Sequence, residues 1–142
     1  METNNNIKLE EPFALFGIEC GDGWKSLYKP IFDYIIEYNK DKKEDEKIVI
    51  HQLKEKFGGM RCYTNFCTDE LRKIIDEAEE KSYNTCEMCG EPFKKPIIDH
   101  HWIYPMCQKC FDKMQDQRKK SFEEFKKKIN EVKLKQGENN KD

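Results

Sequence analysis

The 142-residue sequence has no apolar run that approaches the roughly 18–20 residues of a membrane span. Residues 1–6 lack the basic and apolar regions of a secretory signal peptide. Charge of one sign is not in excess either, because 26 lysines and arginines oppose 28 acids for a net charge of −2. That balance excludes a strongly basic protein but not a local basic patch. We therefore expect a cytoplasmic protein without membrane attachment.

The sequence also lacks the patterns of common catalytic sites and any internal repeat. No nucleophile–base pair, phosphate-binding loop or carboxylate dyad is recognisable. Only 37% of the residues are hydrophobic, whereas 38% are charged, so the core must be small for the chain length. A small core often needs a metal ion or another cross-link. These absences favour a non-catalytic protein with an additional source of stability.

Cysteine supplies such a source. Four of the seven cysteines form two Cys-x-x-Cys pairs separated by 17 residues: Cys86 with Cys89, and Cys107 with Cys110. This spacing matches a zinc pattern, since two such turns can aim four thiolates at one tetrahedral ion. Disulfides or four buried thiols are the alternative. The sequence predicts one structural Zn²⁺. Cys20, Cys62 and Cys67, with His51 nearby in sequence, match no trusted metal spacing, and we expect these three cysteines to pack as small hydrophobes.

The order of the sequence signals predicts an α+β fold in which a helix, a β-hairpin and a second helix precede a zinc ribbon and a C-terminal helix. It comprises a disordered leader at 1–12, an α+β body at 13–85, a Cys₄ zinc ribbon at 86–110, a basic amphipathic helix at 111–136 and a disordered tail at 137–142.

Two helices are expected within the body. Apolar residues at helical spacing predict a helix over 24–38, with Asp22 as its N-cap. Pro30 predicts a kink there, or a division into two pieces. Thr68 precedes a second run of helically spaced apolar residues, which predicts a capped helix over 69–80.

Residues 47–64 predict a β-hairpin with Gly58-Gly59 as its turn. That turn places Lys56 opposite Arg61, and strand alternation places four side chains on one face: Lys54, Lys56, Arg61 and Tyr63. Such a face is a candidate nucleic-acid or anion site, because cations bind phosphate and an aromatic ring stacks on a base. The alternative, which we favour, is a solvated face whose acids come from Glu55 or the second helix.

Four motifs occur in a fixed order: Cys20-Gly21-Asp22-Gly23-Trp24, residues 54–61, residues 85–90, and Trp102-Ile103 before the second cysteine pair. Together they resemble a family of small zinc-ribbon proteins from phages and bacteria, some encoded beside mobile elements. The likeness covers roughly residues 16–110 and implies kinship rather than a mechanism. Cys62 departs from the family pattern, where an aromatic residue is usual, and His101 stands where a small residue is expected.

Asp99-His100, between the cysteine pairs, resembles the Asp-His pair of ββα-metal (HNH-type) nucleases. In those enzymes the histidine is the general base of a metal-assisted attack on a phosphodiester. However, Phe111 follows the last cysteine, at the position where the nuclease pattern has asparagine. In addition, no histidine follows His101. A metal-dependent nuclease is therefore the alternative function.

The C-terminal helix carries a stripe of four apolar residues at 3-4-3 spacing: Phe122, Phe125, Ile129 and Val132. The stripe either packs on the body, pairs with a second copy or docks on a partner. The leading prediction is a non-catalytic zinc-binding accessory or regulatory module that contacts a macromolecule. The candidates are nucleic acid, bound through the hairpin face and basic helix, and a host protein if the gene is phage-borne, in which case the protein lies in the host cytoplasm.

Overall fold

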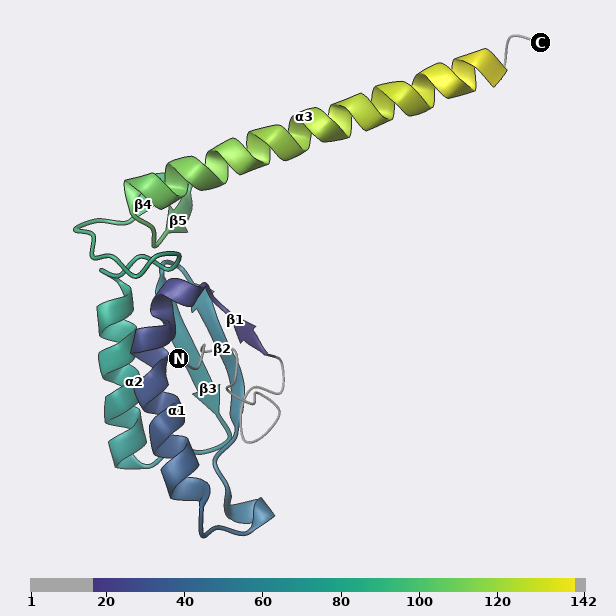
Figure 1. The fold of residues 1–142 in the computed structure, drawn as a ribbon. Helices are drawn as coiled ribbons and strands as arrows, with labels where there is room; N and C mark the ends of the chain where they lie inside the picture. The colour runs from purple at the N-terminus through teal and green to yellow at the C-terminus, as the bar shows by residue number, and fades with distance from the viewer. Residues whose placement is uncertain (1–16, 140–142) are drawn as a thin grey trace, which may run out of the picture. The chain divides into compact units, whose positions relative to one another are not determined.

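The computed structural model describes residues 17–139, and their side chains as far as residue 137. The predicted leader at 1–12 and residues 140–142 of the predicted tail lie outside this range. The chain divides into two compact units, Met1–Cys107 and Gln108–Asp142. The first contains helices and two small sheets, and the second a single helix (Figure 1). The predicted α+β fold class is confirmed.

The larger sheet of the first unit has three strands in the order β1 (Ile18–Glu19), β2 (Ile50–Lys56) and β3 (Gly59–Thr64). β2 and β3 form the predicted hairpin, and β1 adds a short parallel strand to the other side of β2. Helices α1 and α2 lie side by side against one face of this sheet (Figure 1). The opposite face of the hairpin is therefore free to carry polar side chains.

Helix α1 (Lys25–Asn39) follows a 3₁₀ turn, η2 (Asp22–Trp24), and a second 3₁₀ turn, η3 (Glu44–Glu46), lies in the next loop. The prediction of Asp22 as N-cap was wrong, because Asp22 begins η2 and makes no side-chain capping bond. Helix α1 runs through Pro30 as one element, so it is not divided into two pieces there. An internal proline costs about 3 kcal/mol. Apolar residues on both sides of it are buried, at about 1.5–3 kcal/mol per side chain, so packing outweighs this cost.

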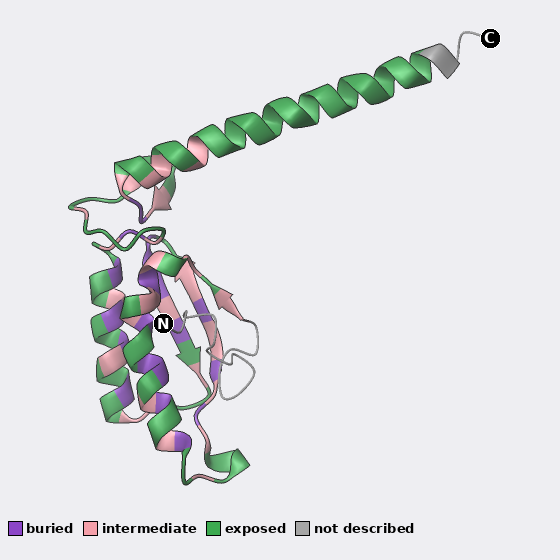
Figure 2. Cartoon of the chain, viewed as in Figure 1, coloured by how far each residue is buried: buried purple, intermediate pink, exposed green. Residues whose placement is uncertain are grey.

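The core of the first unit lies between the two helices and the sheet (Figure 2). Helix α2 (Asp69–Ser82) contributes its apolar face and begins with the predicted cap, in which the Thr68 hydroxyl accepts a hydrogen bond from Leu71 N–H at 3.1 Å. The fully buried large side chains include Trp24, Ile31, Phe32, Ile35, Ile48, Ile50, Leu53, Met60 and Leu71.

A buried side-chain amide joins the end of α1 to the segment just before β2. Asn39 donates to the carbonyl oxygen of Ile48 and accepts from its N–H, both at 2.9 Å. Asn65 makes an equivalent pair of bonds to the chain nearby, to Val49 N–H at 2.9 Å and the Lys47 carbonyl at 3.0 Å, but Asn65 is exposed.

We expect Asn39→Ala to lower the free energy of unfolding by about 2 kcal/mol, because it leaves two buried backbone groups without partners. Asn65→Ala is the matched control and should lower it by less than about 1 kcal/mol, since water can replace the lost bonds. Urea denaturation of both variants checks this. Equal losses would show that burial does not set the strength of these contacts.

The second unit is helix α3 (Gln108–Asn139), 32 residues long. It begins within the second cysteine pair and continues beyond residue 136, so residues 137–139, predicted as part of the tail, are helical. A single glycine at 137 weakens a helix by about 1 kcal/mol without stopping it. Among the described residues, no helix combines the length and the apolar character needed to cross a membrane.

Candidate metal centre

A two-stranded ribbon separates the two cysteine pairs. Strands β4 (Ile97–Asp99) and β5 (Trp102–Tyr104) pair antiparallel, with Ile98 opposite Ile103. Both strands lie within residues 86–110, where the sequence predicted a zinc ribbon. The turn between them brings the chain back, so that the second cysteine pair returns toward the first.

The four predicted ligands are brought together. The sulfur atoms of Cys86, Cys89, Cys107 and Cys110 all lie within 4.8 Å of one another. Cys89 and Cys107 have their sulfurs 3.7 Å apart. A tetrahedral ion with metal–sulfur bonds of about 2.3 Å requires sulfur–sulfur edges of roughly 3.8 Å, whereas a disulfide requires about 2.05 Å. These four cysteines can therefore hold a metal ion, and none of them is in a disulfide.

Backbone groups around the first cysteine pair favour the thiolate form of its buried member, Cys86. Gly90 N–H donates to the Cys86 carbonyl at 2.9 Å and closes a tight turn, in which Gly90 adopts a φ of +83°. Burial raises the pKa of the Cys86 thiol, but N–H groups of Cys107, Cys89 and Met88 point at the sulfur and bring the pKa down to about 7. The protein thus stabilises a thiolate, the form that binds metal.

The three cysteines outside the cluster are held in the thiol form rather than as thiolates. Cys62 is buried in the core, and Cys20 and Cys67 pack against it, as expected of small hydrophobic side chains. Burial raises the pKa of Cys20 and of Cys62 to about 12, and it also raises that of Cys67. Within residues 17–139, neither these cysteines nor His51 belong to a group that could hold a metal.

The first cysteine turn is bound to the start of α1, a connection that the sequence analysis missed. Gly23 N–H donates to the Glu87 carbonyl at 2.7 Å, and the Trp24 indole N–H donates to the Thr85 carbonyl at 2.8 Å. A Cβ atom on Gly23 would lie 2.3 Å from the Cys86 carbonyl oxygen. The signal in the sequence was the Gly-x-Gly-Trp run, whose glycine is required here by the close approach of two backbones.

Glu87, in this junction, lies near the carboxylate of Glu55. Burial, and after it the negative charge of Glu55, raise the pKa of Glu87 to about 7, despite a hydrogen bond from the Gly21 backbone. This carboxyl group is therefore partly protonated at neutral pH. Glu87, the neighbour of Cys86, thus carries less than one full negative charge beside the four cysteine sulfurs.

The hairpin register differs from the predicted one. The loop is Phe57-Gly58, with φ of 54° and 83°, so that Lys54 pairs with Arg61 and Lys56 with Gly59. Positive φ at both loop positions is typical of a type I′ turn. The predicted Gly58-Gly59 turn and the Lys56–Arg61 pair were therefore wrong. The slip is two residues, which preserves the face, so Lys54, Lys56, Arg61 and Tyr63 still share one side of the hairpin.

Arg61 is neutralised within the chain. Its guanidinium nitrogen Nη1 lies 2.8 Å from a Glu79 carboxylate oxygen and donates to the Tyr83 hydroxyl at 3.1 Å. An acid from the second helix thus faces Arg61, as in the solvated-face alternative. Lys56 is exposed, with its Nζ atom 5.5 Å from the centre of the Phe57 ring. Lys54 is half-buried and lies opposite Glu19 of β1 in the sheet. Among the three cations of this face, Lys56 is therefore the exposed one.

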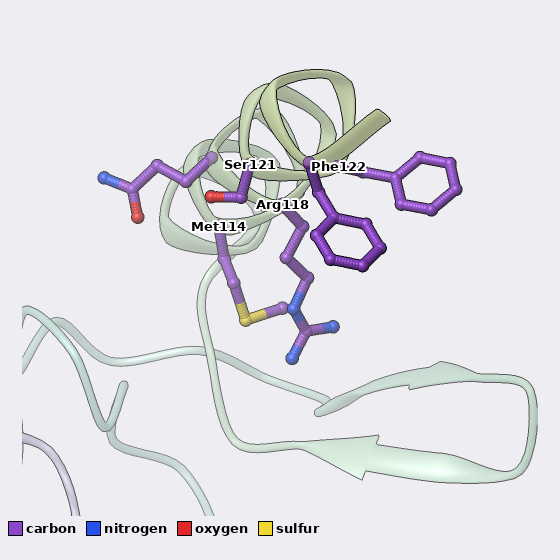
Figure 3. A pocket seen from close by; sticks show the side chains of 6 residues that line it. Met114, Arg118, Ser121 and Phe122 are labelled. Carbon is purple, nitrogen blue, oxygen red and sulfur yellow. The ribbon is translucent and has the colours of Figure 1, made fainter. Parts of the chain in front are cut away.

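The predicted stripe on α3 is exposed, and Phe122, for example, is 56% accessible. A hollow of about 410 Å³ lies on this face, lined by Met114, Gln117, Arg118, Ser121, Phe122 and Phe125. Figure 3 shows Met114, Arg118 and Phe122 on the same side of the helix. In heptad terms, lysines occupy the positions on both sides of the stripe: Lys126 and Lys133, and Lys128 and Lys135.

Asp99 and His100 are close together at the tip of the ribbon. His100 Nδ1 lies 2.9 Å from an Asp99 carboxylate oxygen, and the His100 side chain is 93% exposed. In the part of the chain that the structure describes, the cysteine cluster is the only group that could hold a metal. The nuclease alternative therefore has no metal-binding group at His100 in that part of the chain.

Comparison with known proteins gives one line of similarity. No family model matches the chain, and no solved structure matches it. The chain is 30% identical, over an alignment of 146 residues, to a tRNA uridine(34) hydroxylase of Prochlorococcus marinus (strain MIT 9515). The alignment covers 95% of this chain but 43% of that protein, so the chain spans less than half the length of its relative. The resemblance to a phage zinc-ribbon family stays a prediction.

Proposed function

We propose that the chain is a zinc-binding module that contacts RNA and does not itself catalyse a reaction. Zinc is supported by the donor set, because four sulfurs at tetrahedral spacing suit Zn²⁺, whereas Mg²⁺ and Ca²⁺ prefer oxygen. Four protein ligands leave no open coordination position, so the ion is structural. Free thiols are stable in a reducing compartment, which supports the cytoplasm as its location.

RNA as the partner is supported by the similarity to a protein named for tRNA. That relative is more than twice as long as the part aligned with this chain, so the shared part is not expected to perform hydroxylation alone. Contact with the RNA is the contribution we infer for it. If the resemblance to phage proteins holds, the RNA would be that of the host.

The observation that carries the proposal is the outward face of β2. Lys54 and Lys56 lie two residues apart on this face, and within residues 17–139 neither forms an ion pair. Two lysines at this spacing can reach neighbouring phosphates of one strand. Tyr63, on the same face, is 45% exposed and offers a ring to a base.

We expect the double variant Lys54→Glu/Lys56→Glu to bind a labelled single-stranded RNA about tenfold more weakly at physiological salt. It should also reduce the dependence of log K on log salt by about 1.4, which corresponds to two lost phosphate contacts. Fluorescence anisotropy at several salt concentrations measures both. Arg61 is left intact because its contact with Glu79 is structural.

Lys73→Glu/Lys81→Glu is the matched control, since both lysines are exposed on α2 and the change in net charge is the same. This control should keep the affinity within about twofold beyond the general effect of charge. Equal weakening in the two double variants would contradict a specific contact at the hairpin. No binding of any RNA by the parent protein would end the proposal.

A protein partner is the second candidate function, and the charges along α3 favour it. Lysines flank the exposed stripe on both sides, while Glu123, Glu124 and Glu131 point away from it in heptad geometry. A second copy would place lysines against lysines, which disfavours the self-association considered from sequence. An amphipathic helix with acids beside its apolar stripe is the partner that these charges fit.

A further inference from the structure

The first unit contains a hollow at the point where the tips of its two hairpins meet. The hollow has a volume of about 240 Å³. It is lined by the end of β2, the loop after it, the β4–β5 turn and the start of β5: Glu55, Lys56, Phe57, His101, Trp102 and Ile103. A cavity of about 150 Å³ is enough for benzene. The hollow therefore has room for a flat ring system of one or two rings.

The walls of the hollow are held in place by close packing. A Cβ atom on Gly58 would lie 2.7 Å from a methyl carbon of Ile103, so the two hairpins touch where only glycine fits. The Glu55 carboxylate accepts a hydrogen bond from Gly58 N–H at 2.8 Å and fixes the loop from within. A ligand would thus enter a site whose backbone is already arranged.

Backbone strain is concentrated at the same two tips. In the described part of the chain, the non-glycine residues with positive φ are Phe57 (54°), His100 (49°) and His101 (66°). Each such residue costs of order 1 kcal/mol or more, and Asn-Gly would form the hairpin turn at lower cost. Phe57 and His101 both line the hollow. Strain that persists at a preformed hollow indicates that these side chains are positioned for binding.

The chemistry of the lining suits a nucleobase. Phe57 and Trp102 are 72% and 61% exposed, which is unusual for rings of this size and leaves much of each ring accessible to a base. Lys56 is close to Phe57 and supplies a cation for the adjoining phosphate. The Glu55 carboxylate and the His101 ring add hydrogen-bonding groups for a base edge.

We propose that this hollow binds an unpaired base of a single RNA strand, stacked against Trp102 and Phe57, with Lys56 facing the neighbouring phosphate. The inference rests on the proposed RNA-contact function and names its recognition site. It assigns single-stranded rather than duplex RNA, because bases in a duplex are already stacked. The strand would continue along the hairpin face that carries Lys54.

The test uses the full zinc-loaded chain and a labelled decamer of uridines. Trp102→Ala and Phe57→Ala should each weaken binding about 10- to 100-fold, since stacking contributes this much per base. Phe122→Ala, which removes an exposed phenylalanine from α3, is the matched control and should change the affinity less than twofold. A 10-base-pair RNA duplex should bind the parent protein more weakly than the decamer does.

Tryptophan emission supplies a readout that a structural effect would not mimic. Trp24 is fully buried, so quenching of emission by the decamer reports on the exposed Trp102. In Trp102→Phe, which keeps a ring for stacking, the affinity should stay within about threefold while the quenching disappears. This variant also covers the case in which Trp102→Ala fails to fold.

The outcomes separate the two proposals. If Lys54→Glu/Lys56→Glu weakens RNA binding while Trp102→Ala and Phe57→Ala leave the affinity unchanged and the decamer does not quench the parent protein, the hollow is not the site and the RNA-contact function stands. If the parent protein binds neither the decamer nor the duplex, both proposals fall. Equal binding of decamer and duplex without quenching also overturns the hollow as a base site.

Discussion

Replacing Cys86 with serine is expected to abolish metal binding by the four cysteines and to unfold the ribbon between the cysteine pairs. Cys86 is the buried ligand, and the N–H groups aimed at its sulfur stabilise a thiolate that serine cannot replace. Structural zinc supplies on the order of 10–16 kcal/mol of apparent folding free energy at pH 7, and three ligands retain only part of it. The ribbon has little else, because its two strands are three residues each.

Metal analysis of the purified variant should find far less than one ion per chain. Hydrogen exchange should show amides of residues 85–107 exchanging within seconds, while amides of the buried sheet stay protected. The sheet survives because its core is built from α1, α2 and the hairpin and includes none of the four clustered cysteines. The parent protein treated with a strong chelator should behave in the same way.

Cys67→Ser is the matched control, since it makes the same atomic change at a cysteine outside the cluster. It should retain the full metal content and the protection of the ribbon. A Cys86→Ser protein that kept its metal, or a metal-free protein whose ribbon stayed protected, would contradict a structural Cys₄ centre.

Adding one methyl group at Gly23 is expected to lower the free energy of unfolding by about 3 kcal/mol. The new Cβ atom would lie 2.3 Å from the Cys86 carbonyl oxygen and 2.6 Å from the Gly90 nitrogen. Both are backbone atoms of the first cysteine turn, so no side-chain movement can make room. The variant Gly23→Ala must also stretch the hydrogen bond from Gly23 N–H to the Glu87 carbonyl.

A loss of about 3 kcal/mol corresponds to a decrease of roughly 12–24 °C in Tm for a domain of about 60–100 residues. Urea denaturation followed by tryptophan emission measures the free energy directly, because Trp24 is buried beside the junction. Gly137→Ala is the control: nothing lies within 4 Å of its added Cβ, and alanine favours a helix, so the body should be unaffected. A Gly23→Ala protein as stable as the parent would show that the two backbones separate freely.

The position of the hairpin turn could not be derived from local turn preferences alone. Both Phe57-Gly58 and Gly58-Gly59 satisfy the two-residue turn pattern, and the double glycine has the stronger intrinsic preference. Tertiary contacts select the first. The Tyr83 ring occupies the space beside Gly59, where a Cβ would lie 2.5 Å from it, so Gly59 must be in the strand. Gly58 is needed in the loop for its positive φ and its contact with Ile103.

For the hairpin face, the sequence predicted which charged side chains lie on one side but not which acid neutralises Arg61. Strand alternation has a period of two, so the side of the sheet that carries Lys54 and Arg61 survived a two-residue error in register. The Arg61–Glu79 ion pair joins residues 18 positions apart in the sequence and depends on how α2 packs beside β3. Nothing in the spacing of the charges identified Glu79 among the several acids of that helix.

The sequence by itself determined the α+β order of elements, the four cysteines of the metal centre and the cap of α2, because each depends on residues that are near one another or on a fixed spacing. Only the tertiary structure decided the register of the hairpin, the binding of the first cysteine turn to Gly23 and Trp24, and the hollow between the two hairpin tips. These features depend on the close approach of segments far apart in the chain, and such contacts follow from shape and packing rather than from any local preference.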